Sequence, residues 1–153
     1  MCSSDLPPPG AETLATRLAD VQEVLAAQRQ GRLGIEGKGV VLVGHSLGGL
    51  TALLASGLAP VPGLEARCRQ ALLRLPINNP SRLLQCQLAS TGLPATPVPP
   101  PDLRGVVVLN GFGSLLWPSR GLAALPVPVL MAGGSLDLVT PPVRSEEHTS
   151  ELQ

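Results

Sequence analysis

The segment from Gly39 to Leu58 constrains the fold most, because it joins an apolar strand to an apolar helix through a glycine turn. The run Gly-Val-Val-Leu-Val-Gly that begins at Gly39 shows no polar alternation, which is typical of a strand buried on both faces of a parallel sheet. Residues 47–58 are rich in Ala and Leu and predict a helix. Between the two lies Gly-His-Ser-Leu-Gly, Gly44 to Gly48. Strand, turn and helix in this order predict an α/β fold.

Further segments extend this pattern on both sides. An amphipathic helix is predicted over Glu12 to Gln30. Its apolar positions recur at helical spacing at Leu14, Leu18, Val21 and Leu25. A second buried strand is predicted over Arg104 to Asn110 and a third over Val127 to Ala132, after a short helical stretch near residues 120–125. We therefore expect three neighbouring parallel strands with flanking helices and right-handed crossovers.

The stretch from Pro60 to Asp102 interrupts this alternation with prolines and scattered polar residues. We interpret it as an insertion that carries two short helices, near Leu64 to Leu75 and Pro80 to Leu88. The whole chain of 153 residues has room for one ordinary domain. Its 11 basic residues equal its 11 acidic residues, so no nucleic-acid partner is expected. No apolar run approaches the length of about 20 residues that a membrane span requires.

The pattern Gly-x-Ser-x-Gly has a mechanical reason at each position. A serine at a sharp turn between strand and helix needs small neighbours, and Gly44 and Gly48 are expected to provide that clearance, helped by Gly49. The Ser46 oxygen then stands at a helix N-terminus, where the Leu47 N–H can donate to an oxyanion. So short a pattern also arises by accident in glycine-rich chains. Its position between a buried strand and an apolar helix favours the functional interpretation, with Ser46 as a catalytic nucleophile.

These residues carry a resemblance to the α/β-hydrolase superfamily. Val41 to Gly49 resembles its nucleophile strand and elbow, and Pro126 to Pro142 resembles the later strand and loop that hold the acid of the triad, which falls on Asp137. Cys68 to Cys86, together with the helix that contains Asp20 to Leu25, is similar to a bacterial branch described as dienelactone hydrolase-like or platelet-activating-factor-acetylhydrolase-like. The resemblance covers nearly all of residues 7–143.

The resemblance implies a partial α/β-hydrolase fold, truncated at both ends, that keeps central strands and omits the first four and the last. It implies a serine hydrolase that cleaves a small-molecule carboxylic ester through an acyl-enzyme, without a cofactor. Two rivals stay open. One is other acyl chemistry on the same fold, such as amide, peptide or thioester cleavage, and the other is a non-catalytic binding protein that keeps the elbow as scaffold.

The remaining triad positions have competing interpretations. Ser-Leu-Asp after a strand is also an ordinary turn composition, but the place of Asp137 after Gly133 and Gly134 in the third strand unit favours the acid role. His45 adjoins Ser46, so the elbow geometry points its side chain away from a base position. His148 is the only other histidine, and another helix and strand should separate acid from base in this fold. The catalytic histidine is therefore expected outside the chain, which alone would be inactive.

Two cysteines, Cys68 and Cys86, flank part of the insertion. A disulfide between them would hold the insertion together covalently and would indicate an oxidising compartment. The alternative is two reduced buried thiols. No metal site is expected, because no histidine or carboxylate cluster accompanies them. Phe112 and Trp117 fit either a substrate pocket or core packing. Whether the protein is cytoplasmic or exported is not predicted.

Both ends of the chain differ in character from the rest. Residues 144–153 are polar and can be back-translated into one strand of a short-read sequencing adapter. Residues 1–6, Met-Cys-Ser-Ser-Asp-Leu, can be back-translated into the opposite strand if GTG serves as the start codon. We therefore expect residues 1–6 and 144–153 to be adapter-derived and to make few contacts with the core, and residues 7–143 to be the hydrolase segment.

Overall fold

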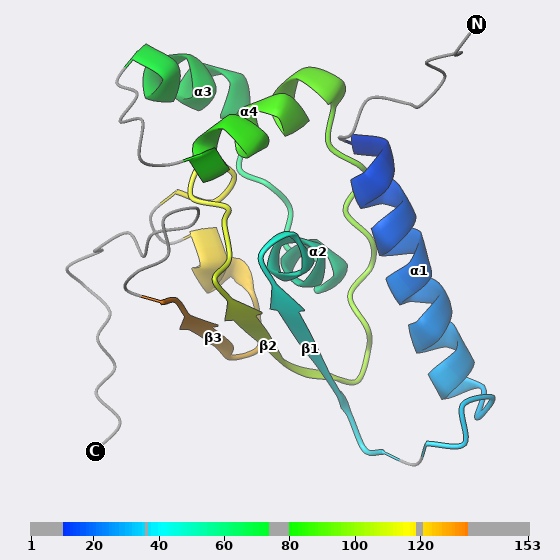
Figure 1. The fold of residues 1–153 in the computed structure, drawn as a ribbon. Helices are drawn as coiled ribbons and strands as arrows, with labels where there is room; N and C mark the ends of the chain where they lie inside the picture. Colours follow the sequence, from blue (N-terminus) through cyan, green and yellow to red (C-terminus); the bar gives the residue numbers. More distant parts are fainter. Residues whose placement is uncertain (1–10, 36, 74–79, 119–120, 135–153) are drawn as a thin grey trace, which may run out of the picture.

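The computed structural model describes residues 11–35, 37–73, 80–118 and 121–134 (Figure 1). In these ranges the strands are β1 (Val40–His45), β2 (Leu103–Leu109) and β3 (Val129–Ala132). The helices are α1 (Ala11–Arg29), α2 (Leu47–Ala55), α3 (Leu64–Leu73), α4 (Pro80–Thr91) and the short 3-10 helix η1 (Gly121–Ala124). The predicted order of helices and strands is confirmed, and the fold is α/β.

The three strands form one parallel sheet in the order β1-β2-β3, as predicted. Val43 of β1 lies opposite Val107 of β2, and Val107 lies opposite Leu130 of β3. Because all strands run the same way, the segments that follow them meet at one edge of the sheet. Ser46 follows β1, Asn110 follows β2 and Gly133 follows β3 at that edge, where open α/β sheets carry their sites.

One face of the sheet is covered by two helical layers. Helix α2 packs against β1 and β2, and α1 packs on α2 (Figure 1). Leu50, Leu53 and Leu54 of α2 are almost completely buried between these layers. On α1 the predicted apolar stripe is confirmed, since Leu14 and Leu18 join the same core. The hydrophobic core therefore lies directly beneath the glycine turn.

The two helices predicted between β1 and β2 are present. Helix α3 starts at Leu64 as expected and is described to Leu73, and its predicted end at Leu75 lies outside the described residues. Helix α4 starts at Pro80 and continues to Thr91, three residues beyond the predicted end. Gly92 stops it there, because its φ of 84° is a left-handed conformation that glycine adopts without a side-chain clash. Both helices pack on each other, away from the sheet (Figure 1).

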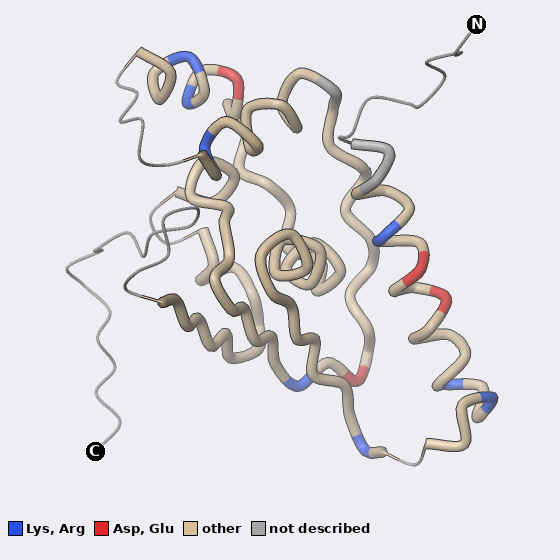
Figure 2. Tube along the Cα trace, viewed as in Figure 1, with Lys and Arg blue, Asp and Glu red and all other residues tan. Residues whose placement is uncertain are grey.

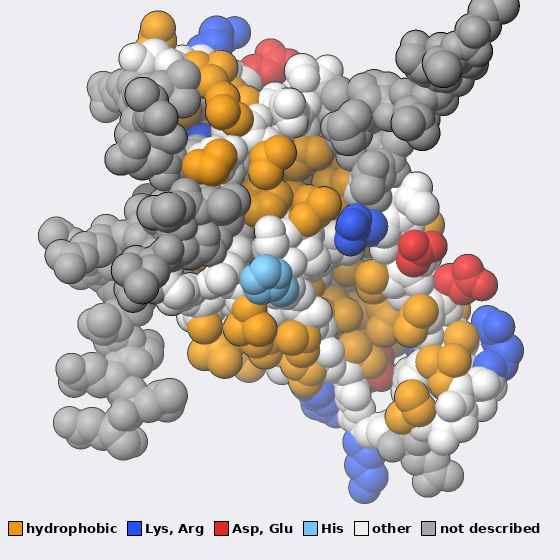
Figure 3. Space-filling view, viewed as in Figure 1, with side chains coloured by type: hydrophobic (Ala, Val, Ile, Leu, Met, Phe, Trp, Pro, Cys, Tyr) orange, Lys and Arg blue, Asp and Glu red, His pale blue; other side chains and the backbone are white. Residues whose placement is uncertain are grey.

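The prediction that β1 is buried on both faces is wrong for this structure. Its burial alternates, with Leu42 and Gly44 buried and with Val41 and Val43 exposed by 54% and 64%. Leu130 of β3 is 58% exposed on the same side. An apolar strand is buried on both faces only if helices cover both faces of the sheet. The described helices cover one face. Figure 3 shows the resulting hydrophobic surface over the strands.

This open sheet face predicts self-association of the chain, and β1 adds a free edge because only β2 pairs with it in the described sheet. We expect Val43→Lys to reduce association strongly and to change the free energy of unfolding by only about 0.5 kcal/mol, as is usual for exposed positions. Sedimentation velocity and urea unfolding measure the two effects. Val106→Lys is the matched control, because Val106 is 1% exposed on the covered face and a lysine there should unfold the chain. Unchanged association of the Val43→Lys variant would contradict the prediction.

Charged residues are spread over the surface of the described chain without a single-sign field (Figure 2). They lie mainly along α1, on α3 and α4, and in the segments that lead into β1 and β2. None of the helices in the described ranges combines the length and the hydropathy that crossing a bilayer requires.

Candidate active site

Ser46 occupies a strained backbone position between β1 and α2. Its φ is 53° and its ψ is −120°, a combination that non-glycine residues rarely adopt. Three hydrogen bonds hold it there. The Ser46 N–H donates to the Leu109 carbonyl at 2.9 Å, and the Ser46 carbonyl accepts from Gly49 at 2.9 Å and from Leu50 at 3.3 Å. The strain is thus maintained by β2 on one side and by the first turn of α2 on the other.

The three elbow glycines differ in how closely other atoms approach them. A Cβ at Gly44 would overlap the backbone of Gly48 and of Gly49. A Cβ at Gly49 would lie 2.8 Å from Val108 Cγ1, which is closer than carbon atoms pack. At Gly48, by contrast, a Cβ would meet nothing within 4 Å. A side chain is therefore excluded at Gly44 and at Gly49. At Gly48 there is room for a Cβ, and it is the Gly48 backbone that excludes a side chain at Gly44.

The elbow ends at the N-terminus of α2. Ser46 is the N-cap residue of α2, and its hydroxyl makes no capping hydrogen bond within the described structure. The Gly49 and Leu50 N–H groups make the first hydrogen bonds of the helix, to the Ser46 carbonyl. The Leu47 N–H precedes them in the first turn, where backbone N–H groups have no partner within the helix. Donors in this position stabilise negative charge that develops next to the serine oxygen.

Asn110 joins the ends of β2 and β3 at the same edge and was missed by the sequence interpretation, which assigned it to the strand. Its φ is 43°, its N–H donates to the Ala132 carbonyl at 2.7 Å, and its side-chain Oδ1 accepts from the Gly134 N–H at 2.8 Å. It therefore holds Gly134 at the carboxyl end of β3. An asparagine directly after a buried strand is the signal that could have identified it, since asparagine tolerates left-handed backbone.

The predicted acid and both histidines of the chain are accounted for as follows. Asp137 and His148 both fall in residues 135–153, outside the described ranges. His45 is exposed and alternates with Gly44, so it lies on the open face of the sheet with Val43. Among the described residues, no group of three or more His, Cys, Asp or Glu side chains is arranged to hold a metal ion.

Cys68 of α3 and Cys86 of α4 are joined in a disulfide, with their Cα atoms 5.5 Å apart. Phe112 and Trp117 are 8% and 6% exposed and belong to the hydrophobic core. The Trp117 Nε1–H donates to the Ala59 carbonyl at 3.0 Å. Of the two interpretations of these aromatic residues, core packing is therefore the one that the structure supports.

A surface hollow of about 400 Å³ lies between α3 and α4, with Gly63, Leu64, Leu88 and Leu93 among its lining residues. None of the residues from Gly44 to Gly49 contributes to it. The hollow lies where α3 and α4 pack on each other, and the strained backbone of Ser46 lies elsewhere, at the end of β1. The elbow, and not this hollow, is the candidate site.

Comparison with known proteins agrees with this geometry at the level of the family. The sequence model of the family described as "Alpha/beta hydrolase family" matches residues 3–151. The matched range includes parts of both terminal segments, 1–6 and 144–153. No curated protein and no solved structure matches the chain.

Proposed function

Because the chain belongs to the α/β-hydrolase family, we propose that it is the nucleophile-bearing part of a serine hydrolase that cleaves carboxylic esters through an acyl-enzyme. The observation that carries the proposal is the strained Ser46 between the parallel strand β1 and the N-terminus of α2. This arrangement has a cost in backbone strain, and such strain persists mainly where function requires it. Hydrolase activity follows from the family, and the ester substrate and the residue roles are our inference.

In the proposed mechanism, Ser46 Oγ attacks the ester carbonyl carbon while a histidine accepts the serine proton. The carbonyl oxygen becomes an oxyanion and accepts a hydrogen bond from the Leu47 N–H. The alcohol then leaves with the proton from the histidine, and water hydrolyses the acyl-enzyme by the same steps in reverse. Asp137 orients the histidine, and Asn110 supports the segment that leads to Asp137 by its hydrogen bond to Gly134.

We also propose that the histidine and the second oxyanion donor are encoded outside residues 7–143, with residues 1–6 and 144–153 derived from adapter. His45 supports this assignment, because the alternation along β1 places it on the open face of the sheet with Val43. Sequencing the uninterrupted gene tests both points. We call its product the gene-completed protein. A gene that encodes residues 144–153 in frame and unchanged would contradict the adapter origin.

Within the family we propose the dienelactone hydrolase-like or platelet-activating-factor-acetylhydrolase-like branch. The support is the sequence of the segment from Cys68 to Cys86 and of the helix that contains Asp20 to Leu25, which resembles that branch. The branch implies a small ester or lactone as substrate. A panel of short-chain esters, lactones, amides and thioesters distinguishes this class from other acyl chemistry on the same fold.

Covalent labelling tests the nucleophile directly. We expect a fluorophosphonate probe to add one phosphonyl group to the gene-completed protein at Ser46, because only an activated serine attacks it at a useful rate. Intact mass and peptide mapping locate the adduct. Ser46→Ala should abolish it, whereas Ser56→Ala should not, because the Ser56 hydroxyl is buried and donates to the Leu53 carbonyl. A folded gene-completed protein that is neither labelled nor active would favour the non-catalytic alternative.

A further inference from the structure

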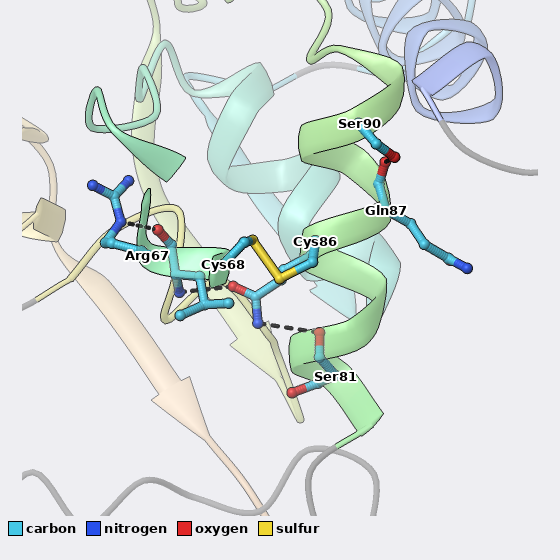
Figure 4. The surroundings of a disulfide bond; sticks show 8 residues. Arg67, Cys68, Ser81, Cys86, Gln87 and Ser90 are labelled. Carbon is cyan, nitrogen blue, oxygen red and sulfur yellow. Dashed lines mark hydrogen bonds between the residues drawn. A yellow bond between two sulfur atoms is a disulfide. The ribbon is translucent and has the colours of Figure 1, made fainter. Parts of the chain in front are cut away.

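The backbone of Leu115, in the segment that follows β2, is held on both sides by side chains from α3 and α4. Arg67 Nε donates to the Leu115 carbonyl at 2.6 Å, and the Leu115 N–H donates to Gln85 Oε1 at 2.8 Å (Figure 4). Arg67 is the neighbour of Cys68, and Gln85 is the neighbour of Cys86. The disulfide therefore links the two residues next to the two clamping side chains.

Every side-chain nitrogen and oxygen of the two clamping residues makes a hydrogen bond. The remaining guanidinium nitrogens of Arg67 donate to the Pro62 and Val61 carbonyls at 2.6 Å each. Gln85 is completely buried, and its Nε2 donates to the Ser81 carbonyl at 3.2 Å. If Leu115 moved away, the buried Oε1 of Gln85 would lose its hydrogen bond, which lowers stability. The clamp is thus sensitive to the spacing between α3 and α4.

The clamped segment also reaches the elbow. A Cβ at Gly49 would lie 3.7 Å from Gly111 Cα, so the first residue after Asn110 lies against the first turn of α2. At its other end, Val61 donates to the Leu116 carbonyl at 2.9 Å, and Trp117 donates to Ala59. Residues 111–117 therefore connect the flank of the elbow to the α3–α4 pair.

Helix α3 buries few of its own side chains among the described residues. Leu64 and Cys68 are its buried residues, and Leu72 and Leu73 are exposed by 41% and 87%. A helix of ten residues with so small a buried face is marginal without a covalent link. The disulfide is therefore a major part of what keeps Arg67 at its distance from Gln85.

We propose that the disulfide between Cys68 and Cys86 is a redox-controlled brace that sets the order of residues 111–117 beside the elbow. Reduction by a dithiol transfers two electrons and two protons: the S–S bond breaks, two cysteine thiols form and the dithiol closes to its own disulfide. Helix α3 then separates from α4, Arg67 and Gln85 no longer clamp Leu115 together, and the segment loosens while the sheet and α2 persist. Arg67 and Gln85 are positioning residues. This inference does not depend on the ester hydrolase proposal.

Trp117 is the single tryptophan of the chain and reports on this segment directly. We expect dithiothreitol to release two thiols, to shift Trp117 emission to longer wavelength and to raise acrylamide quenching severalfold, with far-UV circular dichroism largely preserved. Amide exchange at Leu115 should accelerate in parallel. The Cys68→Ser/Cys86→Ser variant should show the reduced-state signal without reductant and no further response. Cys2→Ser, which leaves the pair intact, should respond as the original chain does.

A second comparison tests the clamp without reductant. Arg67→Lys retains the charge and loses the planar fork, so it should raise Trp117 quenching in the oxidised chain. Arg69→Lys, at an exposed position on the same helix, should not. Unchanged emission, quenching and Leu115 exchange after two thiols have appeared would overturn the proposal. Loss of all helical signal together with the Trp117 shift would overturn it as well, because the disulfide would then stabilise the whole chain and not one segment.

Discussion

Ser46→Ala is expected to lower kcat/KM of the gene-completed protein for a short-chain chromogenic ester by about 10⁴- to 10⁶-fold. The reason is that an alanine removes the attacking oxygen, and the remaining oxyanion donors only provide the residual catalysis seen when a triad member is lost. The 153-residue chain alone is expected to hydrolyse the same ester no faster than its own Ser46→Ala variant. The reason is the proposed assignment, in which the base is encoded outside residues 7–143, and a serine without a base is a poor nucleophile.

The two proteins must be compared at equal concentrations of folded protein, since we expect the exposed apolar sheet face of the chain to promote association. Circular dichroism and gel filtration establish that condition. Asn110→Ala is an informative intermediate variant. It removes the hydrogen bond to Gly134 and places an alanine at a left-handed φ of 43°, and it should still reduce turnover far less than Ser46→Ala. Ser46-dependent turnover by the isolated chain would refute the missing-histidine argument.

The second large effect concerns stability of the elbow. Gly44→Ala is expected to lower the free energy of unfolding by about 3 kcal/mol or more, because its Cβ would overlap the backbone of Gly48 and Gly49, which cannot move as a side chain does. Gly48→Ala should leave stability unchanged or raise it by up to about 1 kcal/mol, since a Cβ there meets no atom and alanine favours helix. Urea unfolding of the gene-completed protein measures both.

This pair of variants forms a matched control, because the same chemical change is made at two glycines of one motif. Similar losses at both positions would show that Gly48 is as crowded as Gly44 and would contradict the geometry described above. A loss of stability in the Gly44→Ala variant alone would show that glycine is required at the first position of the motif because the backbone of α2 lies against it. It would leave the last glycine to be explained by access to Ser46, which activity of the Gly48→Ala variant measures.

The local sequence predicted the order of elements and the elbow, because both depend on short-range chemistry. Apolar β-branched runs predict strands, the stripe that includes Leu14 and Leu18 predicts α1, and a serine between glycines predicts the strained turn. Parallel pairing of the three strands follows from the helices that connect them. For these features the residues within about one element suffice.

Features that depend on distant residues were decided by the tertiary structure. Val43 has the sequence environment of a buried strand residue, yet it is exposed because the described helices cover one face of the sheet. Gly44 and Gly48 are the same residue type, and only the close approach of backbones distinguishes them. Arg67 and Gln85 meet Leu115 across 48 and 30 residues of chain. Local pattern carries no information about contacts at such separations, since they form only when the packed helices bring the partners together.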